Sequence, residues 1–135
     1  MIPEGNQRVE AVTLTAYKVL HLFGVFMMFV ALGGASIHAA SGGERNAATR
    51  RLVGILHGLG LLVSLTAGFG MLARLGMSSL FSAAPGWIIA KIVLWLLLGG
   101  LIALPYRKPS YASAMAIALP LLGLLAAWLA LYKPF

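Results

Sequence analysis

Four side chains that can carry chemistry lie within long apolar runs of this 135-residue sequence: His21, His57, Lys91 and Trp95. A neutral imidazole is a metal ligand, an ammonium binds anions, and an indole lines cofactor pockets. Lys91 is the most unusual of the four, because an ammonium in hydrocarbon costs about 2.5–3.5 kcal/mol on insertion scales. We therefore expect Lys91 to reach the membrane surface, to pair with an anion or to take part in catalysis.

The remaining polar residues exclude several kinds of site. The chain has no cysteine, which excludes disulfides, thiolate metal sites, iron–sulfur clusters and covalent haem attachment. Its three acids, Glu4, Glu10 and Glu44, all lie outside the apolar runs. A carboxylate relay across a membrane therefore has no residues to use. The methionines suggest copper handling as a weaker interpretation, but their spacing has no ligand pattern.

The composition indicates a membrane protein. Hydrophobic residues make up 61% of the chain and charged residues only 10%, whereas soluble proteins have about 25% charged residues. The formal net charge is +7, and the cations stand at the ends of apolar runs, as in membrane flanks. We predict the lipid bilayer as a partner, a bacterial cytoplasmic membrane as the location, and no nucleic acid as a partner.

Four apolar runs are long enough to cross a bilayer as helices, which takes about 20 residues for a hydrocarbon core of about 30 Å. The predicted helices are residues 13–40, 52–73, 86–104 and 110–132, and the polar residues 1–12 are expected to form a short tail. Because the loops between them are short, neighbouring helices are expected to run antiparallel. The predicted fold is all-α, a single integral membrane domain in the form of an antiparallel four-helix bundle.

Small residues recur four positions apart in the second predicted helix. Gly54 and Gly58 form one such pair, and Gly60, Ser64 and Gly68 form a longer series. This spacing is typical of helix faces that approach closely in membranes. It favours packing inside the bundle, and the alternative is contact with a second copy or with another membrane subunit.

Depth in the membrane can be estimated from position at about 1.5 Å per residue. On this measure His21 and Lys91 lie in the same half of the membrane, roughly 10 Å and 6 Å from the midplane. They are therefore candidates for one cavity. His57 lies in the other half, at a depth about 18 Å from His21, which is too far for the two to clamp one iron. His38 is near a helix end, where we expect it to be solvated.

Four segments resemble, in order and spacing, membrane proteins of the HemJ, CopD and SirB-like kind. They are residues 17–21 (Tyr-Lys-Val-Leu-His), 50–52 (Arg-Arg-Leu), 68–70 (Gly-Phe-Gly) and 87–91 (Trp-Ile-Ile-Ala-Lys). The HemJ pattern has Lys-x-x-His in its first helix and Trp-x-x-x-Lys in its third. Two further elements of that pattern, a Leu-Pro-Arg after the first helix and a late histidine in the third, are missing here.

The resemblance implies a protein that binds haem b or another porphyrin and has a redox or electron-transfer role. If the chain is an enzyme, it implies a membrane oxidoreductase of the protoporphyrinogen oxidase type. The positions carried over are His21 as the metal ligand and Lys91 as the catalytic and cofactor-binding residue. His57, which the family pattern does not explain, and Trp95 are further candidate cofactor-binding residues.

An interpretation from a different class is a cofactor-free accessory subunit. Such a chain would pack against other subunits of a membrane complex, or against copies of itself, through its glycine-rich faces. A visible absorption spectrum separates the two interpretations, because only a bound macrocycle gives a Soret band.

Overall fold

The computed structural model describes residues 3–43, 47–77 and 84–134, and all regular structure in these ranges is helical. The prediction of an all-α chain is confirmed. The long helices are α1 (Glu4–Ala40), α2 (Ala47–Arg74), α4 (Gly86–Leu101) and α6 (Ala112–Tyr132). The turn between the last two contains a short helix, α5 (Leu104–Arg107), and the 3-10 turn η1 (Pro109–Tyr111).

The first helix starts earlier than predicted, at Glu4 instead of residue 13. Pro3 precedes it in an extended conformation, and Glu4 places a negative charge in its first turn, where the helix dipole favours one. The polar stretch that was expected to be a tail is therefore part of α1.

The third predicted helix is divided. α4 ends at Leu101, and the chain resumes as α5 with Pro105 in its first turn. A proline has no N–H to donate to the carbonyl four residues earlier, so it begins a new helix more easily than it continues an old one. The sequence pair Gly99 and Gly100 also weakens the last turn of α4.

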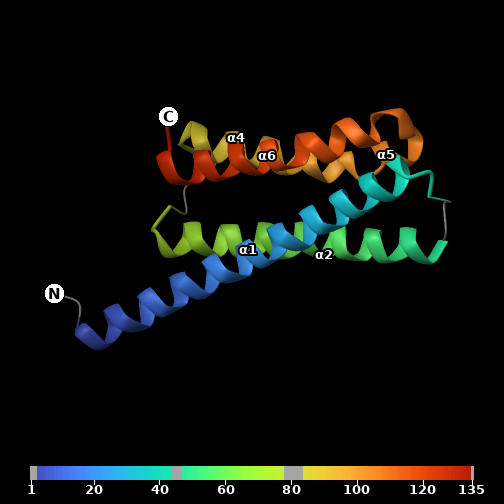
Figure 1. Cartoon of the computed structure of the whole chain (residues 1–135). Coiled ribbons are helices and arrows are strands. Elements are labelled where there is room, and N and C mark those ends of the chain that lie inside the picture. The colour runs from blue at the N-terminus through green and yellow to red at the C-terminus, as the bar shows by residue number, and fades with distance from the viewer. Residues whose placement is uncertain (1–2, 44–46, 78–83, 135) are drawn as a thin grey trace.

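The helices group around α1, as Figure 1 shows. α1 packs along α2 on one side and against α6 on the other, and α4 lies beside α6. The colours show α1 and α4 running one way across the view, and α2 and α6 running the other way. The start of α1, the end of α2, the start of α4 and the end of α6 therefore lie toward the same end of the molecule.

The buried core is small and lies around the middle of α1. Its main cluster joins α1, α4 and α6 through Met28, Leu32, Leu94, Leu98, Met115 and Leu119. Only 17–33% of the residues in the apolar windows of the four long helical segments are buried. Large side chains such as Phe26, Ile117 and Leu131 point outward. All four segments are long and apolar enough to cross a membrane, and their outward faces suit lipid.

The backbones of α1 and α2 touch where they cross. A Cβ atom added to Gly24 would lie 2.5 Å from the Ser64 nitrogen, and one added to Gly60 would lie 2.7 Å from the Gly24 carbonyl oxygen. Nothing larger than hydrogen fits at either position. The series that begins at Gly60 therefore packs inside the chain, as the small-residue spacing predicts.

The other small-residue pair is not used in this way. Around Cβ atoms added to Gly54 and Gly58 the structure has no atom within 4 Å. Both glycines are exposed, and so are Ile55 and Leu62 on the same helix. For this pair the prediction of packing inside the bundle is wrong, because α1 crosses α2 further along, at Gly60.

Candidate functional site

His21 is tied to the neighbouring helix by one of its ring nitrogens. Nδ1 lies 2.6 Å from the carbonyl oxygen of Ser64. A carbonyl only accepts hydrogen bonds, so Nδ1 carries the proton and the lone pair of the neutral ring is on Nε2. The ring is half-buried, and Nε2 has no hydrogen-bond partner among the residues that the structure describes. Nε2 is therefore the atom with which His21 can bind a metal.

The glycine contact between α1 and α2 makes this bond possible. Gly24 lies close to one turn after His21, and its contact with Ser64 brings the two backbones together. Gly68, one turn beyond Ser64, lies against the ring, since a Cβ there would be in van der Waals contact with Nδ1 of His21 at 3.4 Å. The close approach of Gly24 to Gly60 and Ser64 thus places the imidazole as well as the helix.

Lys91 points toward the start of α4. Side chains of a helix lean toward its N-terminus, and Nζ of Lys91 lies 5.9 Å from the ring centre of Trp87, one turn earlier. Lys133, directly after α6, places its own Nζ 5.4 Å from the same ring. The Lys91 side chain extends toward the N-terminal end of α4, as a lysine does when it carries its charge out of an apolar layer.

His21 and Lys91 come from different helices and act on each other electrostatically. Lys91 is close enough for its positive charge to act on the His21 ring. α1 and α4 therefore each place one ionisable side chain in this part of the molecule.

His57 is in a different situation from His21. Its side chain is 4% exposed, and Nε2 lies 3.3 Å from the carbonyl oxygen of Gly99, so this nitrogen donates to α4. Nδ1 is buried and has no hydrogen-bond partner within the described residues. His57 links α2 to α4, and the nitrogen that remains has no access from outside.

The two histidines lie at different levels, as predicted, although closer than the estimate. The His21 ring lies against Ser64 and Gly68, which are seven and eleven residues after His57 in the same helix. That spacing corresponds to about 10–16 Å along α2, compared with the 18 Å expected. The difference arises because α1 and α2 cross at their glycines and not at the centres of their apolar runs.

Trp95 also bonds to α2. Its Nε1–H donates to the carbonyl oxygen of Leu61 over 3.2 Å, and the hydroxyl of Ser64 donates to the same oxygen over 3.0 Å. The segment from Leu61 to Ser64 thus accepts side-chain bonds from both α1 and α4. Trp95 braces two helices, and its ring is half-buried beside them.

Two features of the structure were not predicted from the sequence. The first is the contact of Lys133 with Trp87, since Lys133 was counted only among the cations at the ends of apolar runs. His38 lies against the turn that ends α1, where a side chain at Gly43 would overlap its ring.

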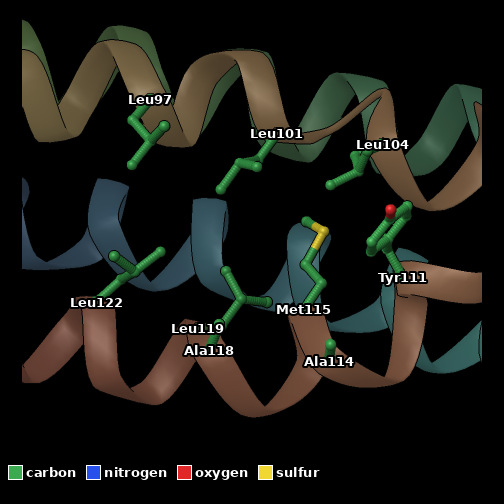
Figure 2. A pocket seen from close by; sticks show the side chains of 9 residues that line it. All are labelled: Leu97, Leu101, Leu104, Tyr111, Ala114, Met115, Ala118, Leu119 and Leu122. Atoms are coloured by element: carbon green, nitrogen blue, oxygen red, sulfur yellow. The ribbon is translucent and has the colours of Figure 1, made fainter. Parts of the chain in front are cut away.

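The structure has an apolar groove of about 300 Å³ between α4 and α6. Figure 2 shows the side chains that line it, which are Leu97, Leu101, Leu104, Tyr111, Ala114, Met115, Ala118, Leu119 and Leu122. None of the predicted site residues lines this groove. It lies toward the turn between α4 and α6, away from Lys91 and Trp87.

Within the described ranges, no three His, Asp or Glu side chains are grouped to hold a metal ion. A metal at His21 would therefore need most of its ligands from elsewhere. A porphyrin meets this need because its four nitrogens surround the iron and the protein supplies only axial ligands. The donor set at His21 fits such a group.

The chain matches no protein-family model, no curated protein and no solved structure.

Proposed function

We propose that this chain is an integral membrane protein, folded as an antiparallel four-helix bundle, that binds haem b or a related macrocycle through His21. The observation that carries the proposal is the bond from Nδ1 of His21 to the carbonyl of Ser64. Histidines that bind metals usually donate their other N–H to a carbonyl or carboxylate, which fixes the tautomer and the ring orientation.

The other residues would support this site in different ways. Lys91 supplies a positive charge near His21 and is suited to a carboxylate or another anionic substituent of the macrocycle. Trp95 and His57 hold α4 against α2 through Leu61 and Gly99, so they position the site and do not ligate the metal. The haem, when bound, would supply one-electron chemistry.

A redox or electron-transfer role follows from that chemistry, and oxidation of a porphyrinogen is the enzymatic form of it that the resemblance implies. The described part of the chain offers no paired carboxylates and no acid beside His21, Lys91 or Trp95. Hydrolytic catalysis therefore has no support here.

A reduced-minus-oxidised difference spectrum of the purified protein, made with ample haem, tests the proposal. We expect a b-type spectrum that is lost in His21→Ala and kept in His38→Ala, a control on the same helix. A protein without any such spectrum, or a spectrum that survives His21→Ala, would contradict the proposal.

The exposed pair Gly54 and Gly58 favours a second candidate function. These glycines leave a smooth face on α2 that the chain itself does not cover, as an accessory subunit of a membrane complex or a homo-oligomer would need. We expect Gly58→Leu to reduce co-purification with other subunits, or the size of the oligomer, under this candidate. Unchanged assembly in Gly58→Leu, together with a haem spectrum, would set it aside.

A further inference from the structure

Two ammonium groups converge on one indole at the end of the molecule where α4 begins and α6 ends. The ring of Trp87 lies 5.9 Å from Nζ of Lys91 and 5.4 Å from Nζ of Lys133. The lysines are far apart in the sequence and come together because α6 returns beside α4 (Figure 1). Each is near enough to the other for their charges to interact.

This arrangement has no internal counter-ion in the described part of the chain. Neither lysine makes an ion pair with a described carboxylate, and both contacts with Trp87 are cation–π contacts. Lys91 is also half-buried, so its charge is only partly hydrated. Two like charges at a partly dry site repel each other, and an anion bound between them would relieve that repulsion.

We propose that Trp87, Lys91 and Lys133 form a binding site for the phosphate of an anionic phospholipid. Basic pockets between membrane helices bind the headgroups of such lipids, and tryptophan favours the headgroup level. This inference depends on the membrane placement proposed above, and it does not depend on haem binding.

The surrounding surface favours a lipid over a soluble phosphate. The apolar windows of the two segments that contain α4 and α6 are only 17% buried, so most of the apolar side chains of these helices face outward. The acyl chains of a phospholipid would lie along these apolar side chains while its phosphate reaches the lysines. A free phosphate ion would gain only the second of these contacts.

The end of α6 fixes the position of one lysine. Lys133 has a φ of 45° and is the only residue other than glycine with positive φ among those described. This left-handed conformation ends the helix and turns the chain as Lys133 reaches Trp87. Its ammonium is thus placed by the helix end and not by a long exposed tail.

Native mass spectrometry of the full chain tests the inference. The protein is made without added haem and released from nanodiscs of equal parts phosphatidylglycerol and phosphatidylcholine. A juxtamembrane lysine contributes about a fivefold preference for anionic lipid, so two lysines give about twenty-five-fold retention of phosphatidylglycerol over phosphatidylcholine. We expect Lys133→Gln to lower this preference about fivefold. Lys91→Gln should lower it similarly.

The control is Arg74→Gln, which removes an exposed cation at the same end of the molecule. We expect it to leave the preference unchanged. Equal retention of the two lipids, or an equal loss in Arg74→Gln, would overturn the proposal. Inorganic phosphate that displaces the lipid and itself stays bound would overturn the assignment to lipid. Lys133 is exposed and follows the last helix, so Lys133→Gln decides the matter even if Lys91→Gln does not fold.

Discussion

Nδ1 of His21 and the carbonyl oxygen of Ser64 are 2.6 Å apart, so the histidine is oriented by the backbone of the neighbouring helix. No side-chain substitution removes that acceptor. The orientation depends instead on how closely α1 and α2 approach, and this approach depends on Gly24 and Gly60. The stability of the helix pair and the geometry of the proposed site are therefore linked.

Replacing His57 should leave the proposed haem site intact. We expect the difference spectrum of His57→Leu to match that of the unmodified protein, because Nε2 of His57 bonds to Gly99 and the ring is buried. The free energy of unfolding should fall by about 1 kcal/mol, since side-chain bonds between membrane helices contribute about that much. Loss of the spectrum in a folded His57→Leu protein would show that His57 acts on the cofactor directly.

Gly24→Ala should destabilise the protein, and Gly33→Ala on the same helix should not. A Cβ at Gly24 overlaps the backbone of α2, whereas nothing lies within 4 Å of one at Gly33. Overpacking costs about 1–3 kcal/mol, and alanine at the open position should gain about 0.5–1 kcal/mol from helix propensity. Thermal unfolding in detergent, followed by circular dichroism, measures both. Equal melting temperatures would refute the close contact.

Lys91→Leu should raise the melting temperature in nanodiscs of phosphatidylcholine alone. The change removes a partly buried charge and its repulsion from Lys133, which together cost stability when no anion is bound. In nanodiscs that contain phosphatidylglycerol the gain should shrink, because the lipid stabilises the unmodified protein. A loss of stability in phosphatidylcholine would mean that Lys91 has a structural partner there.

Both ends of the chain should lie on the same side of the membrane. The chain has no cysteine, so the single changes Asn6→Cys, Pro134→Cys and Ser110→Cys each give one site for a membrane-impermeant maleimide. In sealed vesicles we expect the first two to react from one side and the third from the other, as four spans require. A different reactivity of Asn6→Cys and Pro134→Cys would rule out four spans.

The helices themselves were predictable, because long apolar runs without acids have few other structures open to them. The beginning of α1 was not, since polar residues such as Arg8 and Glu10 suggested a tail. Those residues continue the helix that begins after Pro3, and as polar side chains they can stay exposed. Hydropathy locates the apolar part of a helix, but it does not show how far the helix continues into polar residues.

The sequence predicted that α2 packs closely through small residues, but not which of them make the contact. Gly54, Gly58 and Gly60 all satisfy the same spacing rule, and the rule does not say which of them meets another helix. The position of the contact depends on the neighbouring helix, because Gly24 is the residue of α1 that allows the two backbones to touch. The pairing of Lys133 with Trp87 was hidden for a similar reason, since it depends on where α6 returns.

α1 has 37 residues, which at 1.5 Å each is about 55 Å and exceeds a hydrocarbon core of about 30 Å. In Figure 1 its first turns extend beyond the other helices. Because Gly24 locks α1 against α2, those turns can be shortened or lengthened without moving the site. An insertion of one residue between His21 and Gly24 would instead rotate the imidazole by about 100° away from Ser64. The short interval between these two residues therefore sets the angular phase of His21, and the length of the projecting arm is independent of it.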